Sequence, residues 1–389
     1  MIGFRVDANE VIATGHLMRC MAIAKGFQKQ GEEVMFFLAE EKETNRLKAQ
    51  NIPYTILHSK WNVLEQEIPD LKQSLKKYHI TKLIVDSYQV TVPYLESLNQ
   101  CVKVIYIDDM GEVVYPVSAV IHYSNWEWDT TYEERYKGTD ILCMSGMKYT
   151  PLREEFYPNE EKAEEIDIEE KSVETEVIDD IEKHESVNNK KENNTTKNTG
   201  NKKNILITTG GTDQYNIAGR LLEYFINKNM SKQQNNFRQN NIQINNMHFL
   251  VISGSMNQNK SFLEKLANEN ETITLYENVN NMGELMRNSY LAVSAGGTTL
   301  YELCACRVPT VCFSFADNQE GFTNEMGTQG VMCYAGDARK REDIIENIYE
   351  NLMKLWNDEQ LCGQYQKKMG RLVDGKGVER IVERVYYLP

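Results

Sequence analysis

The sequence predicts an α/β protein whose two halves each contain a parallel β-sheet. Short apolar runs of strand length alternate with longer amphipathic runs along most of the 389 residues, which is typical of strand–helix–strand units. The alternation stops in an acidic, then Asn/Lys-rich tract from 158 to 204 and resumes after it. Single cores stop growing at roughly 250–300 residues. We therefore expect two domains.

The elements of the first half follow from apolar runs and helical spacing. The pattern predicts helices over 17–28, 44–50, 64–78 and 93–100, and strands over 2–6, 33–38, 54–57, 82–85, 102–107 and, as the last, 119–121. The first domain is expected to span 1–157. The tract 158–204 has too few apolar residues to offset the entropy of ordering and is predicted to be a disordered insert.

The second half, 205–389, repeats the pattern and is expected to form one domain. We predict strands over 204–208, 249–253, 273–276, 290–294, 310–313 and 331–334, and helices over 217–226, 260–268, 281–288, 300–306, 318–329, 341–356, 359–372 and 377–387. An Asn/Gln-rich stretch, 227–246, is predicted to be a second insert.

Composition excludes several classes of partner and site. A formal net charge of −14 argues against nucleic-acid binding, which favours a basic surface. The eight cysteines show no CxxC or Cys/His ligand spacing, so we expect neither a metal site nor a disulfide framework. No signal peptide and no membrane span of roughly 18–20 apolar residues is recognised. We expect a cytoplasmic monomer that needs no cofactor.

The first candidate site is the turn between the first strand and the first helix. Gly15 permits close approach of a ligand to the backbone, and His16 opens a helix whose N-terminus attracts anions. A histidine is also the side chain best suited to accept a proton near neutral pH. A histidine that only caps the helix fits the position equally well. Asp86, Tyr88, Asp109 and Asn125 follow later strands and are expected at the same sheet edge.

Two glycine turns in the second half also follow strands and precede helices. They present backbone N–H groups and hydroxyls suited to a diphosphate; their residues are Gly210, Gly211, Thr212 and Asp213, then Gly296, Gly297, Thr298 and Thr299. Neither is a Walker A or GxGxxG motif. Glu302 is placed to bind the hydroxyls of a ribose, although an acid in a first helical turn also simply complements the helix dipole.

These motifs together resemble the UDP-sugar hydrolases of pseudaminic acid biosynthesis, a family related to spore-coat polysaccharide proteins. The matching segments, in chain order, are 4–7, 14–19, 86–88, 107–109, 152–156, 210–213 and 318–320. The resemblance implies a GT-B fold, with two Rossmann-like domains that face each other across a cleft. The two inserts and the second glycine turn, Gly-Gly-Thr-Thr, depart from the family. That turn instead resembles the lipid-linked N-acetylglucosaminyltransferases of peptidoglycan synthesis.

The resemblance implies metal-independent, inverting hydrolysis of UDP-2,4-diacetamido-2,4,6-trideoxy-β-L-altropyranose, with release of UDP. His16 would be the general base or orient the water, the glycine turns would hold the diphosphate and Glu302 the ribose. Arg19, Tyr88 and Asn125 would line the sugar, and Asn318 and Gln319 the cleft. Two alternatives remain: a GT-B glycosyltransferase for UDP-amino sugars in cell-surface or spore-coat polysaccharide synthesis, and a non-catalytic UDP-sugar-binding protein.

Overall fold

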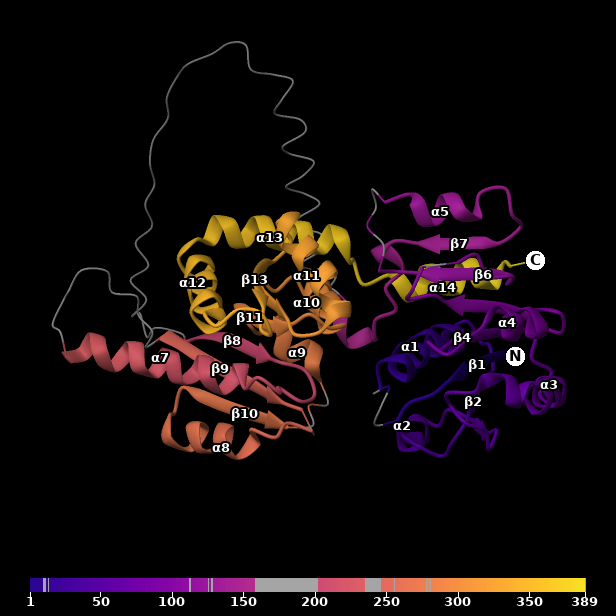
Figure 1. Ribbon diagram of the computed structural model, residues 1–389, viewed down its shortest axis with the longest axis horizontal. Helices are drawn as coiled ribbons and strands as arrows, with labels where there is room; N and C mark the ends of the chain where they lie inside the picture. The colour runs from indigo at the N-terminus through magenta and orange to yellow at the C-terminus, as the bar shows by residue number, and fades with distance from the viewer. Residues whose placement is uncertain are drawn as a thin grey trace, which may run out of the picture. The chain divides into compact units, whose positions relative to one another are not determined.

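The computed structural model describes residues 1–157, 202–234 and 246–388 (Figure 1). Within these ranges it leaves out positions 10, 11, 13, 112, 125, 127, 128, 255, 278 and 280. The chain divides into two compact units. One comprises residues 1–157 together with the segment from Met369 onward, and the other lies within 158–368.

The first unit contains a parallel sheet of seven strands among its described residues, in the order β3-β2-β1-β4-β5-β6-β7. Its strands are β1 Ile2–Val6, β2 Val34–Leu38, β3 Tyr54–Ile56, β4 Lys82–Asp86, β5 Lys103–Ile107, β6 Ala119–His122 and β7 Leu142–Ser145. Its helices are α1 Gly15–Lys29, α2 Thr44–Ala49, α3 Ile68–Lys77, α4 Val92–Asn99, α5 Thr131–Tyr136 and α14 Gly377–Tyr386, with short 3-10 turns η1 Leu64–Glu67, η2 Met147–Tyr149 and η3 Glu154–Phe156.

The described part of the second unit holds a six-stranded parallel sheet in the order β10-β9-β8-β11-β12-β13. Its strands are β8 Lys203–Thr208, β9 Met247–Ser253, β10 Ile273–Glu277, β11 Leu291–Ala295, β12 Thr310–Ser314 and β13 Cys333–Asp337. Its helices are α7 Ile217–Gln234, α8 Lys260–Glu269, α9 Met282–Arg287, α10 Thr299–Ala305, α11 Asp317–Thr328 and α12 Ile344–Asn357, followed by α13 Glu359–Leu372 at the boundary between the units.

Both sheets have the strand order of a Rossmann fold, which confirms the predicted class. The order reverses between β1 and β4 in one unit and between β8 and β11 in the other. Ligands of open parallel sheets bind at the carboxyl ends of the strands at such a reversal. Each unit therefore has one edge position where a site is expected.

The core of the first unit lies on both faces of its sheet. Phe4 of β1 stacks on Phe36 of β2 at 4.8 Å between ring centroids and meets Phe27 of α1 edge-on at 6.5 Å. The opposite face carries Val85 of β4 and Tyr94 of α4 in a second apolar cluster. Every residue of β1 and β2 is buried, as expected for strands covered by helices on both sides.

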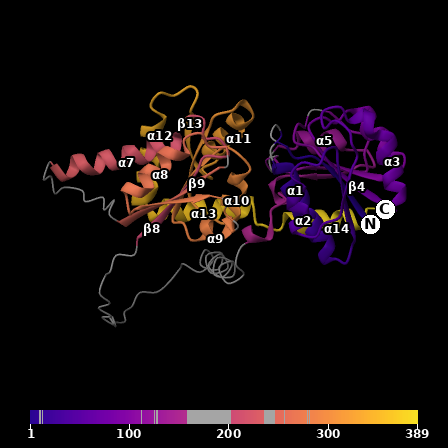
Figure 2. The ribbon, with the colours of Figure 1, turned by 90° about the horizontal axis from the view of Figure 1, so that it is seen from below.

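The C-terminal helix belongs to the first unit, which corrects the expectation that 205–389 forms one domain. Helix α14 runs beside α1 (Figure 2). A Cβ on Gly26 of α1 would lie 2.6 Å from Val378, and a Cβ on Gly377 would lie 2.1 Å from the Thr150 carbonyl oxygen. Arg380 donates to the Lys148 carbonyl oxygen at 2.9 Å. Glycine at two positions thus allows a close docking that helical periodicity does not reveal.

Three further expectations about the elements were wrong. The strand at 119–121 is not the last of its sheet, because α5 and the short strand β7 follow it. The predicted helix over 64–78 begins as the 3-10 turn η1. Helix α7 continues to Gln234, into the predicted insert 227–246, because Lys, Met and Gln are good helix formers and no Gly or Pro interrupts the segment.

The predicted disorder of 158–204 falls almost entirely outside the described residues, and β8 begins at Lys203. None of the described helices is long and apolar enough to cross a bilayer.

Candidate active site

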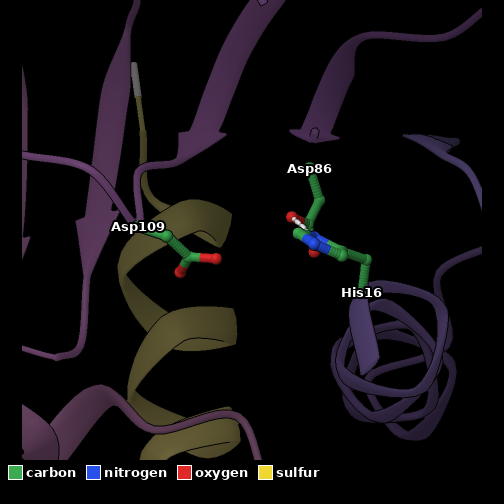
Figure 3. Close-up of side chains that lie close together, drawn as sticks. All are labelled: His16, Asp86 and Asp109. Carbon is green, nitrogen blue, oxygen red and sulfur yellow. Dashed lines mark hydrogen bonds and ion pairs between the residues drawn. The ribbon is translucent and has the colours of Figure 1, made fainter. Parts of the chain in front are cut away.

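The candidate active site of the first unit lies where the strand order reverses. Asp86 is the last residue of β4, Asp109 follows β5 by two residues, and His16 and Arg19 lie on the first turns of α1. Figure 3 shows His16, Asp86 and Asp109 converging from these three elements. The sheet order brings together side chains that are 70 to 90 residues apart in the sequence.

His16 and Asp86 form a buried hydrogen-bonded dyad. The Nδ1 of His16 lies 2.5 Å from Oδ1 of Asp86 and 2.9 Å from Nη2 of Arg19. A carboxylate only accepts and a guanidinium only donates. The shorter contact requires a proton between nitrogen and oxygen, so Nδ1–H donates to Asp86. Nε2 is then the nitrogen that carries the lone pair, which is the tautomer that a general base requires.

Arg19 holds the two carboxylates in place. Its Nε donates to Asp86 Oδ2 at 2.6 Å and its Nη2 to Asp86 Oδ1 at 2.5 Å. The same guanidinium donates to both oxygens of Asp109, at 3.0 and 2.7 Å, and to the Tyr123 hydroxyl. We expected Arg19 to line the sugar. In the structure the N–H groups of Arg19 bond instead to side chains of the protein, so Arg19 is buried and holds the dyad in place.

The charges of this cluster keep Asp86 ionised. Burial alone would raise the pKa of the Asp86 carboxyl, but Arg19 and His16 beside it hold that pKa well below its usual range. Burial likewise opposes the charge of Arg19, yet Asp86 and its other partners raise the pKa of the guanidinium. With His16 neutral the two carboxylates and the single guanidinium give the cluster one excess negative charge.

The same three side chains have donor atoms spaced for a metal. One ligand atom each from His16, Asp86 and Asp109 lies within 4.8 Å of the others. The guanidinium of Arg19, however, bonds to both carboxylates and supplies the positive charge among them. These residues therefore fit an internal ion-pair network better than a metal centre.

Two other predicted residues border His16. Tyr88 is 50% exposed and meets the His16 ring edge-on at 4.5 Å. Burial of its hydroxyl and the neighbouring Asp109 raise the pKa of Tyr88 to about 12, so the phenol stays protonated at neutral pH. Gly15 is the first residue of α1, does not have a positive φ, and has no atom within 4 Å of an added Cβ. Gly15 therefore leaves open space beside the backbone for a ligand. Asn125 lies outside the described residues.

Sequence reasoning missed a second buried ion cluster, which forms around Arg5 of β1. Arg5 of β1 donates to both oxygens of Glu67, at 2.5 and 2.8 Å, and to Asp7 at 2.6 Å. Tyr94 donates to the same Glu67 at 2.8 Å, and Asp7 accepts from the Ala39 N–H at 2.7 Å. This cluster anchors the strand end that leads to His16. The charged residues within the apolar run at β1 were its only signal.

In the second unit the two predicted glycine turns lie at one edge of the sheet. They follow β8 and β11, which pair through Thr208 and Ser294. Gly210 has φ +83°, a conformation that favours glycine. The Asp213 carboxylate caps the N-terminus of α7, because it accepts from Ile217 N at 2.8 Å and Ala218 N at 3.2 Å. We expected Asp213 to bind the diphosphate. Its carboxylate already occupies that helix end, and burial raises the pKa of Asp213.

The second turn is not closed in this way. The N-cap residue of α10, Thr298, makes no capping hydrogen bond through its side chain, and Gly297 and Thr298 are exposed. Gly296 serves packing, because its Cβ would lie 2.4 Å from Thr323.

The remaining predicted residues flank the second turn. Glu302 is partly buried on α10 and has a partner within the protein. Gln319 accepts from Phe315 N at 3.1 Å and so supports the loop before α11. Asn318 is exposed beside it, and so is Thr212 in the first turn.

Comparisons with known proteins agree with this architecture. Residues 205–370 match the model of the glycosyltransferase family 28 C-terminal domain, and this segment ends close to the boundary of the second unit at Lys368. The chain therefore has a GT-B glycosyltransferase-like fold, and its second half is similar to the C-terminal domain of glycosyltransferase family 28.

Two curated relatives share sequence with the chain. An uncharacterized protein of Methanocaldococcus jannaschii is 23% identical over 322 residues, which cover 80% of this chain and 54% of the relative. The spore coat polysaccharide biosynthesis protein SpsG of Bacillus subtilis is 23% identical over 179 residues, 46% of this chain and 48% of the relative. The chain thus spans about half the length of the curated relatives it matches.

Solved structures show the same fold at low identity. MurG of Acinetobacter baumannii superposes with a TM-score of 0.61 at 13% identity, over 99% of each chain. S. aureus MnaA, whose structure contains UDP, gives a TM-score of 0.59 at 13% identity, over 99% of this chain and 96% of MnaA.

Proposed function

We propose that this protein binds a UDP-sugar and catalyses displacement of UDP at the anomeric carbon, with transfer of the sugar to an acceptor hydroxyl. The family 28 domain match and the GT-B-like fold support a glycosyltransferase-type reaction. The relative SpsG, a spore coat polysaccharide biosynthesis protein, supports a sugar destined for a surface polysaccharide. The oriented His16–Asp86 dyad is the observation that carries the proposal.

In this mechanism His16 Nε2 accepts the proton of the attacking hydroxyl while the anomeric C–O bond breaks. Asp86 holds the imidazole through Nδ1 and stabilises the imidazolium that forms, and Arg19 fixes Asp86. General-base assistance of this kind is worth roughly 10²–10⁴-fold in rate. Tyr88 borders the sugar side, since its ring contacts His16 and half of it is exposed. We also assign Asn125 to the sugar side, as the sequence suggested.

We assign UDP to the second unit, with the second glycine turn as the main diphosphate site and the first turn as a lesser contact. Gly297, Thr298 and Thr299 offer the diphosphate an uncapped turn, where N–H groups oppose the charge that develops on the leaving group. Glu302 on the same helix would accept from the ribose hydroxyls, with Asn318 and Gln319 nearby on α11. The Gly210–Gly211–Thr212 turn would contribute backbone contacts.

A second candidate function is hydrolysis, with water in place of the acceptor. Its substrate would be UDP-2,4-diacetamido-2,4,6-trideoxy-β-L-altropyranose and its products UDP and the free sugar. One observation favours it: four positions of the motif set that resembles this hydrolase family, Gly15, His16, Arg19 and Asp86, meet at one strand end. The dyad activates either nucleophile.

Release of UDP from the purified chain tests both functions. UDP-GlcNAc and the diacetamido-altrose UDP-sugar are each supplied with and without an acceptor extract. Metal-free release from the second sugar alone supports the hydrolase, whereas acceptor-dependent release supports transfer. His16→Gln should abolish either. The matched control is His248→Gln, since His248 belongs to the second unit and contacts Thr274 at 2.9 Å. UDP binding without release under any condition would instead indicate a non-catalytic binding protein.

A further inference from the structure

Two buried side chains beside the first glycine turn have a polar atom without a hydrogen-bond partner. Ser253, the last residue of β9, is 4% exposed, and Asn257 is 7% exposed. Within the described residues, Ser253 Oγ and Asn257 Nδ2 form no hydrogen bond. Buried polar groups in native proteins are nearly always paired, so two unpaired ones in a single turn need an explanation.

The hydrogen bonds within this turn show which atom of Asn257 lacks a partner. Asn257 N donates to Gly254 O at 3.1 Å, and Asn257 Oδ1 accepts from Asn259 N at 2.8 Å. The amide is therefore oriented, and its Nδ2 is the free donor. Gly254 packs directly on the first glycine turn, because a Cβ there would lie 2.4 Å from Gly211 O.

The flexible side chain of Met256 lies beside the first glycine turn. Met256 is 50% exposed, and its Cε lies 3.6 Å from the position of a Cβ on Gly211. Methionine has three rotatable side-chain bonds and adapts readily to a new neighbour. Rotation of Met256 would open space beside Gly211 without moving the strands.

The charges around the turn favour an uncharged ligand group. The acid next to it is Asp213, whose backbone oxygen accepts from Asn259 Nδ2 at 2.9 Å. The cation Lys260 is paired with Glu277 at 2.8 Å. Among the described residues no cation bonds to this hydroxyl or amide NH₂. The two groups therefore suit a carbonyl or hydroxyl oxygen better than a phosphate.

We propose that Ser253 and Asn257 form a subsite that binds an uncharged carbonyl or hydroxyl oxygen of the UDP-sugar after Met256 turns aside. This inference rests on the proposed function, because it assumes that the ligand is a UDP-sugar. The oxygen belongs either to the base or to a substituent of the sugar. Ligand binding then provides the partners that the two side chains lack in the free protein.

Thermal unfolding of the full chain without ligand tests the first half of the inference. Ser253→Ala removes an unpaired group and should raise the unfolding midpoint of the second unit by roughly 2–4 °C. Ser294→Ala is the matched control, because Ser294 is also buried near a strand end of this sheet but donates to Ala295 O at 3.0 Å. It should lower the midpoint. A lower midpoint for Ser253→Ala would overturn the proposal.

Calorimetric binding of UDP, UDP-glucose and UDP-GlcNAc tests the second half. Ser253→Ala and Asn257→Ala should each weaken binding about tenfold for ligands that carry the recognised oxygen. If the variants lose affinity for all three ligands, the subsite binds an oxygen of the uracil base. If they lose affinity only for the two sugar nucleotides, it binds a sugar hydroxyl. If they lose affinity for UDP-GlcNAc alone, it binds the acetamido carbonyl. Wild-type affinity in both variants overturns the subsite alone. Failure of the wild type to bind any of the three overturns the proposed function as well.

Discussion

Replacement of Asp86 by asparagine separates the two tasks of the dyad, support of the fold and orientation of the base. Asp86→Asn keeps the shape of the side chain but removes the negative charge between His16 and Arg19. The new amide cannot accept from both partners, because its NH₂ group would face a donor of one of them. Loss of one member of a buried ion pair costs about 3–5 kcal/mol. Arg19 keeps its bonds to Asp109, so we expect the lower end, about 3 kcal/mol.

That loss corresponds to a fall of roughly 6–12 °C in the unfolding midpoint of the first unit. With the imidazole no longer held in its tautomer, kcat for UDP release should fall about 10²–10⁴-fold. KM should change little, because the Asp86 side chain is fully buried and does not reach the substrate. Calorimetry measures the first effect, and steady-state release of UDP below the unfolding midpoint measures the second.

Asp109→Asn is the matched control for this experiment. Asp109 also pairs with Arg19 but, within the described residues, forms no hydrogen bond with His16. It should lose comparable stability and less than about tenfold in kcat, since orientation of the base is the larger kinetic effect. Equal kcat in folded Asp86→Asn and wild type would refute the role of the dyad. Equal kinetic losses in both variants would show that Arg19, not Asp86, positions His16.

Three further predictions concern stability. Gly377→Ala places a Cβ 2.1 Å from the Thr150 oxygen and should lower the free energy of unfolding by about 1–3 kcal/mol, as overpacking does. Protection of the α14 amides from hydrogen exchange should drop. A variant as stable as wild type would contradict the docking of α14 on the first unit. Asp213→Ala should lose about 1 kcal/mol of stability in urea unfolding, because the cap of α7 is removed. Asp213→Asn should keep most of that stability, since its amide oxygen can still accept. Equal losses in the two variants would argue against a capping role. Because the folded pKa of Asp86 is depressed, its contribution is complete above the unfolded value of about 4 and declines as the pH falls below it. The stability gap between wild type and Asp86→Asn should therefore narrow from pH 5 to pH 3, and a gap that widens would reverse the assigned sign.

Local pattern was sufficient for most elements of the fold. Apolar runs such as 2–6 and 82–85 predicted β1 and β4 within a residue, because strands buried on both faces need continuous apolar sequence. The strand β7 was missed since only two of its four residues are buried, and α5 was missed because a helix of six residues is too short to show a period.

The candidate site was predictable in part. His16 and Arg19 are three residues apart, so one helix places both. Asp86 was recognised as a strand end, but its bond to His16 depends on β1 and β4 being neighbours in the sheet. The unpaired Ser253 and Asn257 had no distinct sequence signal, and the charge of Arg5 within an apolar run did not reveal that its partner is Glu67.

By itself the sequence determined two parallel-sheet halves, the glycine turns and a histidine at the first helix, because these depend on periodicity and on conformational preferences of single residues. Only the tertiary structure decided that α14 packs on α1, that Arg19 faces inward to Asp86, and that Asp213 closes one turn while the other stays uncapped. Those outcomes depend on which distant groups share a buried volume. In such a volume a charge or N–H group without a partner costs free energy, so nearly all of them are paired within the fold.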